Sequence, residues 1–212
     1  MTGTPSPGTP AATLRPYRDG DLADVYDVCL RTADAGGDAR GIYADGDVVA
    51  DVYAGPYVHL EPDLALVLDD GTRVVAYVVG TSDTQRFVRA CREVWIPRLA
   101  DRHPAPPSPP LTTPDERMVA LHHHPERMLV PELADHPAHL HVDLLPSHQG
   151  AGHGRALVEA FLAAAARAGA PAVHLGVSAA NTRARGFYDR LGFAPIPVAG
   201  SGGTTYLGRS TT

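Results

Sequence analysis

The pattern of hydrophobic and polar positions along the chain contains several short apolar runs, and these predict β-strands. Runs of four to eight apolar or β-branched residues that end at Gly, Pro or Asp are typical of β-strands. They lie at residues 14–17, 64–68, 74–79, 139–145, 172–177, 195–198 and 204–208. Asp69-Asp70-Gly71-Thr72 has the composition of a tight turn. We therefore expect 64–68 and 74–79 to form an antiparallel hairpin, and 204–208 to pair near 195–198.

Between these runs, apolar residues recur at helical spacing. The pattern predicts helices at about residues 22–32, 48–53, 84–96, 114–122 and, rich in alanine, from about residue 152 onward. The expected N-cap residues are Asp19 or Asp21, then Asp47, Asp83 and Thr113. Thr113 and Glu116 also have the spacing of a capping box, with Pro114 at the first helical position. Five prolines within residues 104–110 exclude a helix there and favour an extended loop.

Composition narrows the class of protein. The chain has 212 residues, of which 44% are hydrophobic, which is enough for one or at most two domains with a real core. Its net charge of −6 argues against nucleic acid as the main partner. Cys29 and Cys91 lie in helical patterns, so we expect free thiols, and no apolar run is long enough for a membrane span. Residues 1–12 have no signal character; we expect a disordered tail and a cytoplasmic location.

The candidate binding chemistry is concentrated where the run 139–145 meets the alanine-rich helix. Glycines at a helix N-terminus expose unpaired N–H groups, which suit an anion such as a phosphate. The dinucleotide pattern G-x-G-x-x-G/A fails here, because its last position is Arg155 or Leu157. A nicotinamide-dependent oxidoreductase is therefore the least favoured hypothesis. The pattern Q/R-x-x-G-x-G/A fits at Gln149, Gly152 and Gly154, and it resembles the pyrophosphate-binding turn of the GNAT acetyltransferase superfamily.

A second stretch carries the same resemblance. The segment 181–195 is similar to the GNAT C-terminal motif through Asn181, Ala184, Tyr188 and a closing Leu191-Gly192-Phe193. Residues 181, 184 and 188 share one helical face. The two motifs occur in the family's order, with the run 172–177 between them.

The resemblance implies an α/β (α+β) fold of the GNAT type. It implies a mixed, mostly antiparallel central sheet of about six to seven strands, with helices on both faces and a splay at strand 139–145. Residues 13–212 are then a single domain. Residues 97–138 are an insertion relative to a minimal GNAT fold, long enough to act as a lid.

From Leu14 to Ser210 the chain also resembles the acetyltransferase-like C-terminal domain of the protein O-GlcNAc hydrolases and its stand-alone bacterial relatives. The segments 14–37, 51–68, 142–146 and 206–210 carry this likeness, and no glycosidase domain is present. Some domains of this kind are suspected pseudo-enzymes that lack the acetyl-CoA turn. This chain keeps the turn, which favours cofactor binding. An active acetyltransferase is the main hypothesis, and a catalytically silent acyl-CoA-binding or protein-interaction module is the alternative.

The resemblance also implies a site for acetyl-CoA as cosubstrate. No metal is expected, because no Cys or carboxylate spacing supports a metal site. The implied cofactor-binding residues are Leu144, Leu145, Gln149, Gly150, Ala151, Gly152, His153, Gly154, Arg155, Asn181 and Tyr188. Tyr188 matches the family's tyrosine that protonates the leaving thiolate; a buried core tyrosine is the alternative. Asn181 is expected to bind the cofactor, to cap its helix, or both.

Asp143 is the candidate general base, because burying a carboxylate in an apolar strand costs free energy and such groups are often functional. The alternative is a carboxylate paired with a histidine or an arginine. His141 lies on the same strand face, so a relay is an open option beside simple packing.

The remaining charged and histidine-rich segments give weaker indications of a binding site. His122, His123 and His124 are adjacent in sequence and cannot all face one metal ion. Arg183, Arg185 and Arg190 either reach a phosphate or form a solvated helix face. The acceptor is expected to be a small-molecule or protein amine, and the protein a monomer or a homodimer.

Overall fold

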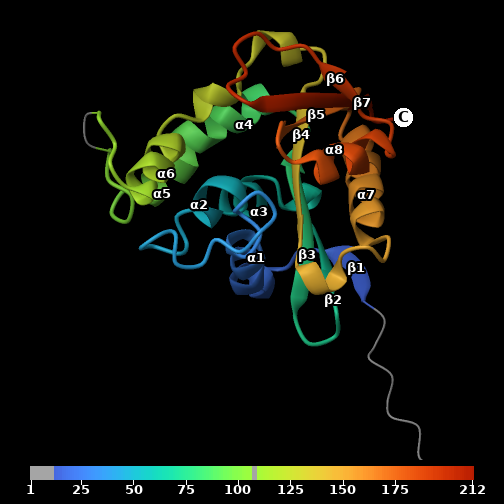
Figure 1. Cartoon of the computed structure of the whole chain (residues 1–212), viewed down its shortest axis with the longest axis horizontal. Helices are drawn as coiled ribbons and strands as arrows, with labels where there is room; N and C mark the ends of the chain where they lie inside the picture. Colours follow the sequence, from blue (N-terminus) through green and yellow to red (C-terminus); the bar gives the residue numbers. More distant parts are fainter. Residues whose placement is uncertain (1–11, 107–108) are drawn as a thin grey trace, which may run out of the picture.

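The computed structural model describes residues 12–106 and 109–212, and its centre is a seven-stranded sheet (Figure 1). The strand order is β1-β2-β3-β4-β5-β7-β6. The strands are β1 (Thr13–Pro16), β2 (Leu66–Asp69), β3 (Val74–Thr81), β4 (Ala138–Leu144), β5 (Ala172–Ser178), β6 (Ala194–Ile196) and β7 (Thr204–Ser210). Every neighbouring pair is antiparallel except β4 and β5. The predicted mixed, mostly antiparallel sheet and its hairpin are thus confirmed.

Helices cover both faces of this sheet, as predicted (Figure 1). The α-helices are α1 (Leu22–Leu30), α2 (Ala50–Tyr53), α3 (Gly55–Leu60), α4 (Thr84–Ala90), α5 (Ile96–Arg98), α6 (Pro114–His122), α7 (His153–Arg167) and α8 (Thr182–Asp189). Short turns of helix are η1 (Asp19–Asp21), η2 (Pro62–Leu64), the π-helical η3 (Cys91–Trp95), η4 (Pro125–Met128), η5 (Pro131–Leu133) and η6 (Pro146–His148). Helices α1 and α3 contact one face of β3, and α7 contacts the other.

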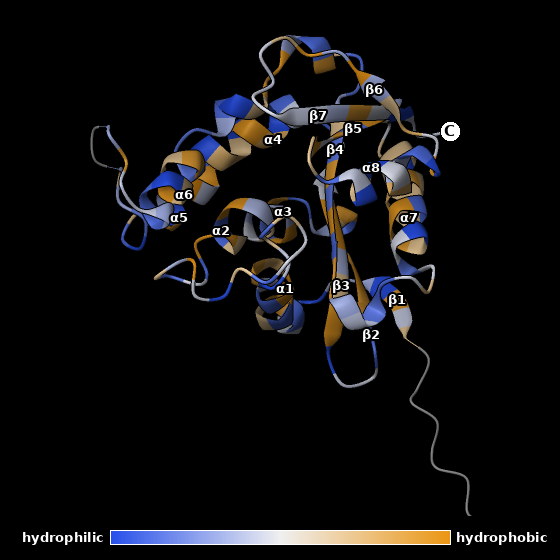
Figure 2. Cartoon of the chain, viewed as in Figure 1, coloured by the Kyte–Doolittle hydropathy of each residue, from blue (hydrophilic) through white to orange (hydrophobic). Residues whose placement is uncertain are grey.

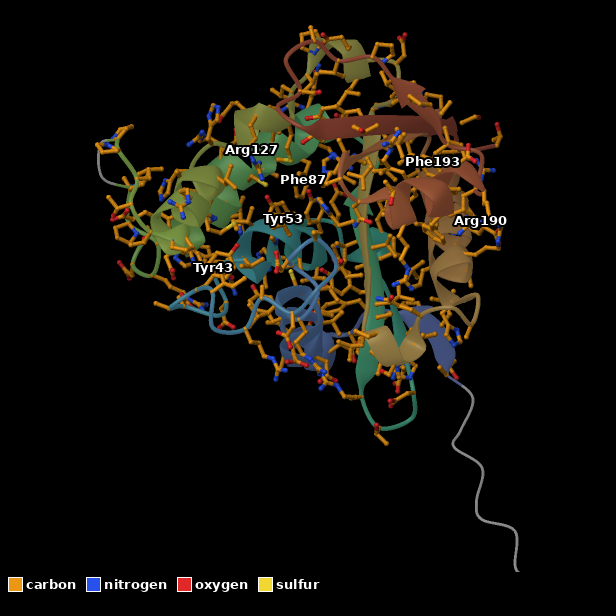
Figure 3. The ribbon with its side chains drawn as sticks, viewed as in Figure 1. Tyr43, Tyr53, Phe87, Arg127, Arg190 and Phe193 are labelled. Atoms are coloured by element: carbon orange, nitrogen blue, oxygen red, sulfur yellow. The ribbon has the colours of Figure 1, made fainter. Side chains whose placement is uncertain are left out.

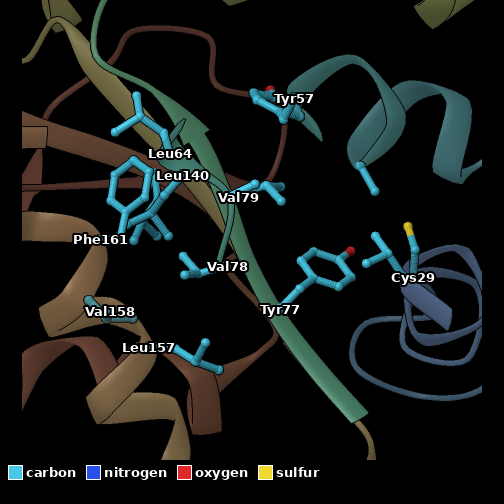
Figure 4. Packing of buried hydrophobic residues seen from close by; sticks show 14 of the residues in the cluster. Cys29, Tyr57, Leu64, Tyr77, Val78, Val79, Leu140, Leu157, Val158 and Phe161 are labelled. Atoms are coloured by element: carbon cyan, nitrogen blue, oxygen red, sulfur yellow. The ribbon is translucent and has the colours of Figure 1, made fainter. Parts of the chain in front are cut away.

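Strand β3 is the centre of the core, since all eight of its residues are buried. Its side chains alternate between the two faces. Tyr77 points toward Cys29 of α1, while Val78 points toward Leu157 and Phe161 of α7 (Figure 4). Figure 2 shows the resulting apolar centre flanked by polar surfaces. The β3 backbone therefore holds α1 and α7 at fixed positions on opposite sides of β4.

The predicted splay lies between β4 and β5. The two strands pair only at Ala138 with Val173 and at His139 with His174. Beyond this point β4 continues along β3 to Leu144, while β5 continues along β7. One edge of β4 consequently lacks a neighbouring strand over the second half of its length, which opens the sheet.

Two predicted N-caps are wrong, and two are confirmed. The Asp21 carboxylate accepts from the Arg18 backbone N–H at 2.8 Å and from the Arg15 guanidinium, so it holds η1 and does not cap α1. Asp47 pairs with Arg102 at 2.7 Å, and α2 begins without a side-chain cap. Asp83 accepts from the Arg86 N–H, and the capping box of Thr113 is formed with Glu116. In both wrong predictions, the carboxylate forms a charge-assisted hydrogen bond with a nearby arginine and does not cap the helix.

The segment 97–138 folds as short helices beside the sheet. Helix α6 contacts α2, and η4 contacts α4. The expected disordered tail at residues 1–12 lies almost wholly outside the described residues, as do two residues of the proline-rich loop at 104–110. Among the described residues, no helix combines the length and apolar character that crossing a membrane requires.

Candidate active site

A cavity of about 840 Å³ opens at the splay between β4 and β5. It receives side chains from both faces of the sheet, because the unpaired stretch of β4 leaves a passage between them. On the α7 side the lining includes Leu144, Gln149, Gly150, Gly152, Gly154 and Arg155. On the α1 side it includes Cys29, Thr32, Tyr43, Tyr53, Met118 and Asp143. We call these the α7 half and the α1 half of the cavity.

The glycine turn shapes the α7 half. Gly150 and Gly152 have positive φ values of 84° and 88°, and a Cβ atom on either would meet nothing within 4 Å. The turn therefore needs glycine for its backbone conformation, and it leaves open space over the first N–H groups of α7. Those N–H groups carry the positive end of the helix dipole, so the chemistry of the turn suits an anion.

Gln149 holds the turn against the sheet. Its Nε2 donates a hydrogen bond of 2.9 Å to the carbonyl oxygen of Leu144 at the end of β4. Ala151 and His153 are not among the residues that line the cavity. Arg155 lines it, and its guanidinium contacts Glu159 and the carbonyl oxygen of Arg190.

The free edge of β4 presents alternate backbone groups to the cavity. Leu145 donates its N–H to Val75 at 3.0 Å, and its side chain is buried in the core. Backbone groups alternate in direction along an antiparallel pair, so Val142 and Leu144 face the free edge and Leu145 does not. The amide of Leu145 is therefore bound within the sheet, and a contact between Leu145 and a cofactor stays a prediction.

Tyr188 on α8 lies where the two halves meet. Its side chain is buried against Phe187 and Phe193, with ring centroids 5.1 and 5.5 Å away, and it lines the cavity. Its hydroxyl has no hydrogen-bond partner among the described residues and is not sealed from solvent. Burial and the nearby Asp143 raise the pKa of Tyr188, so the hydroxyl keeps its proton at neutral pH.

Asn181 caps α8, which is one of the two roles predicted for it. Its Oδ1 accepts from the Ala184 N–H at 3.0 Å. Its Nδ2 donates to the carbonyl oxygen of Ala35 at 3.2 Å, which ties α8 to the loop after α1. Arg183 and Arg190 line the cavity, whereas Arg185 donates to the carbonyl oxygen of Ala179.

Asp143 is the only carboxylate that lines the cavity among the described residues. Its Oδ2 accepts a hydrogen bond of 2.6 Å from the Tyr77 hydroxyl. Burial raises the pKa of Asp143, and the hydrogen bond from Tyr77 partly opposes the increase. The predicted alternative was a pair with histidine or arginine, but the partner here is a tyrosine. His141 is hydrogen-bonded to Tyr57 instead, at 3.1 Å.

His103 and His123 take part in hydrogen bonds outside the cavity lining. His103 Nε2 lies 2.7 Å from the buried Asp51 carboxylate, and His123 Nε2 lies 2.8 Å from the His103 carbonyl oxygen. Across residues 12–106 and 109–212, no group of three or more His, Cys, Asp or Glu side chains is arranged to hold a metal ion.

Several residues of the α1 half were not predicted from the sequence. Cys29 belongs to the end of α1 and Thr32 to the turn that follows it, where the apolar pattern indicated only a core face. Tyr43 and Tyr53 come from the following loop and from α2, and both are labelled in Figure 3. No local motif marks these residues, because they are brought together only by the packing of α1 and α2 against the sheet.

Comparison with known proteins agrees with this geometry. A model of the acetyltransferase (GNAT) family matches residues 117–193. The crystal structure of SsHAT superposes with a TM-score of 0.91 and 56% identity, covering 96% of this chain and 100% of that chain. The chain belongs to the GNAT acetyltransferase family. The family predicted from the two motifs is therefore confirmed.

Other relatives of this GNAT domain are more distant. Protein O-GlcNAcase of Rattus norvegicus is 27% identical over 195 residues, which cover 89% of this chain and 21% of that protein. The chain thus spans about a fifth of the length of the curated relatives it matches. A GNAT superfamily phosphinothricin acetyltransferase of Sinorhizobium meliloti, in complex with AcCoA, shares the fold with a TM-score of 0.55. It is 13% identical and covers 94% of this chain and 88% of that chain.

Proposed function

We propose that this GNAT domain is an acetyl-CoA-dependent N-acetyltransferase that acts on an amine. The observation that carries the proposal is the single cavity through the splayed sheet. It joins an anion-binding helix start, a free strand edge, a protonated tyrosine and a carboxylate. Cofactor and acceptor can therefore approach each other from opposite faces of the sheet.

The residues of the α7 half fit acetyl-CoA. The bare backbone at Gly150 and Gly152 leaves room for a diphosphate over the start of α7. The free edge offers the backbone N–H and C=O groups of Val142 and the N–H of Leu144 to the amides of a pantetheine arm, as in strand addition. The Leu144 carbonyl oxygen is held by Gln149. When bound, acetyl-CoA supplies the acetyl thioester. Arg183 and Arg190 at the cavity offer positive charge to a further phosphate.

In the proposed reaction, the acceptor nitrogen forms a bond to the acetyl carbon and the carbon–sulfur bond breaks. The amine must lose a proton, because a lysine-like amine has a pKa of about 10.4. Asp143 accepts that proton, and its raised pKa makes it a stronger base than an exposed aspartate. Tyr188 donates its hydroxyl proton to the departing sulfur, so CoA leaves as a thiol. The acetylated nitrogen then loses its second proton, which restores the Tyr188 hydroxyl, so the charges balance.

Two measurements test this function. Calorimetry with acetyl-CoA should show binding, and thiol release with a panel of amines should show turnover. Tyr188→Phe should lower kcat about a hundredfold or more, because it removes the proton donor. Tyr206→Phe is the matched control, since Tyr206 lies on β7 and is not among the cavity residues.

Binding of acetyl-CoA without turnover on a broad amine panel would instead select the alternative, a catalytically silent acyl-CoA-binding or protein-interaction module. Turnover that is unchanged in Tyr188→Phe would remove the proposed acid. The acceptor as a small-molecule or protein amine, the cytoplasmic location and a monomeric or dimeric state stay predictions.

A further inference from the structure

Tyr77 of β3 is the hydrogen-bond partner of Asp143, although Tyr77 itself is outside the cavity lining. The two residues lie directly opposite each other in the antiparallel pair of β3 and β4. Side chains of opposite residues share one face of a sheet, so the strand register brings the two side chains together. Tyr77 is fully buried, and its hydroxyl oxygen lies 2.6 Å from Asp143 Oδ2. The contact is therefore made inside the core, where water does not compete for the hydroxyl.

The direction of this hydrogen bond follows from the protonation states around it. Burial, and then the charge of Asp143, raise the pKa of Tyr77 well above its usual value, so the hydroxyl keeps its proton. An ionised carboxylate can only accept a hydrogen bond, so Tyr77 is the donor. Tyr77 points toward Cys29 of α1 (Figure 4), and burial raises the pKa of this thiol to about 12. Tyr77 and Cys29 therefore both stay protonated at neutral pH.

The two oxygens of the Asp143 carboxylate have different surroundings. Oδ2 is bound to Tyr77. The Thr32 hydroxyl is also near the carboxylate, but it donates its one proton to the carbonyl oxygen of Val28 at 2.8 Å. Oδ1 is not among the buried, unpaired side-chain atoms of the described chain. Since Asp143 lines the cavity, Oδ1 is the oxygen that a bound molecule can reach.

The other titratable groups beside Asp143 carry no charge at neutral pH. Tyr188 of α8 keeps its proton, because burial and then the charge of Asp143 raise its pKa. His141, on the same face of β4, is neutral, because burial and then the charge of Arg127 lower its pKa to about 4. Burial raises the pKa of Asp143, and the Tyr77 hydroxyl is the largest of the causes that lower it. Tyr77 is therefore the main group that stabilises the ionised carboxylate.

We propose that Tyr77 is a positioning residue for the reaction: its hydroxyl holds Oδ2 of Asp143 against the sheet, so that Oδ1 meets the acceptor in one orientation. The proposal rests on the proposed function, in which Asp143 is the base, and it names the residue that keeps this base in place. Tyr77 also favours the ionised carboxylate, since a hydrogen bond to a charged group stabilises the charged form. It thereby lowers the pH at which the base becomes available.

Titration of the Asp143 carboxyl by nuclear magnetic resonance tests the proposal without turnover. In protein labelled with ¹³C at the aspartate carboxyl carbons, the Asp143 signal is the one lost in Asp143→Asn. Tyr77→Phe keeps the ring and removes the hydroxyl, so it should raise the midpoint of that signal by about one pH unit or more. An unchanged midpoint in the folded variant would overturn the proposal.

The wild-type protein gives a second measurement that does not depend on the folding of a variant. The ¹³C signal of Tyr77 Cζ should titrate with the same midpoint as the Asp143 carboxyl, because the phenol responds to the charge of its acceptor. A Tyr77 signal that does not follow the titration of Asp143 would show that the hydroxyl does not hold the carboxylate, and the proposal would be wrong.

Tyr26→Phe is the matched control. The Tyr26 hydroxyl also lies 2.6 Å from a buried carboxylate, that of Asp51, and neither residue lines the cavity. The two variants therefore remove the same group from the same kind of contact. Tyr26→Phe should leave the Asp143 midpoint unchanged. An equal shift in Tyr26→Phe and Tyr77→Phe would mean that loosening of the fold moves the midpoint, which refutes the proposal even if the domain is an acetyltransferase.

The pH profile of kcat/KM gives a further readout if the proposed function holds. With acetyl-CoA and an amine that the panel shows to be acetylated, Tyr77→Phe should move the low-pH break, where Asp143 takes up its proton, upward by the same amount as the carboxyl midpoint. Above this break, kcat should fall about tenfold or more because Asp143 is no longer held in one orientation, while the affinity for acetyl-CoA stays unchanged. A break at its wild-type pH in folded Tyr77→Phe would contradict the proposal. Absence of turnover in the wild-type protein would refute the proposed function and leave the carboxyl titration to show whether Tyr77 holds Asp143.

Discussion

Replacing Gly152 by alanine tests the cofactor half of the cavity most directly. Gly152 has φ 88° and ψ −8° just before α7, and a Cβ atom there meets nothing within 4 Å. A left-handed conformation costs an L-residue about 1–2 kcal/mol, so the variant should fold but with reduced stability. For a chain of this size, each 1 kcal/mol lowers Tm by about 2–4 °C. The new methyl group would occupy the space over the helix start that a diphosphate needs.

Gly169 at the other end of α7 supplies the matched control. It has the same φ of 88° and equally open surroundings. Gly152→Ala and Gly169→Ala should therefore lose similar stability in thermal melts. Only Gly152→Ala should weaken acetyl-CoA binding in calorimetry, by at least about tenfold, or about 1.4 kcal/mol. Normal acetyl-CoA binding by a folded Gly152→Ala protein would refute the placement of the diphosphate.

Three further variants test the core and the charges of the cavity. Gly80→Ala should lower the free energy of unfolding by about 2–3 kcal/mol in urea titrations, because its Cβ atom would overlap the His139 carbonyl oxygen and the Phe161 ring. Gly20→Ala is the control. Its surroundings are open, so it should change the free energy of unfolding by less than about 0.5 kcal/mol. Arg127→Met should raise the pKa of His141 in a resonance titration, since a nearby positive charge is removed; an unchanged pKa would show that burial alone sets it. Asp143→Asn should stabilise the fold at pH 7 and not at pH 3. The pKa of Asp143 is higher in the folded than in the unfolded protein, so the free energy of unfolding falls as pH rises from the unfolded pKa through the folded pKa. Asparagine does not ionise, so Asp143→Asn removes that fall. Equal effects at both pH values in urea titrations would contradict this.

The local pattern of the sequence determined most of the secondary structure and the family. Strand runs, helical spacing and the capping box depend on residues within one or two turns of each other, so they can be seen in a linear sequence. The glycine turn is of the same kind. Its two left-handed residues lie in one short segment, and only glycine adopts that conformation without strain. The GNAT family was predicted from this turn and from the segment of Asn181 and Tyr188, and it is confirmed.

Only the tertiary structure decided what the polar residues inside the fold contact. Asp21 and Asp47 were predicted as caps, but each is held by an arginine that the fold brings close. The partner of Asp143 is Tyr77, 66 residues earlier, and Tyr57 meets His139 across 82 residues.

Such partners have no local signal, because a buried polar group must satisfy its hydrogen bonds with whatever the packing places beside it. The direction of the Leu145 amide likewise depends on its pairing with β3, since a strand's alternation is set by its neighbour and not by its own sequence.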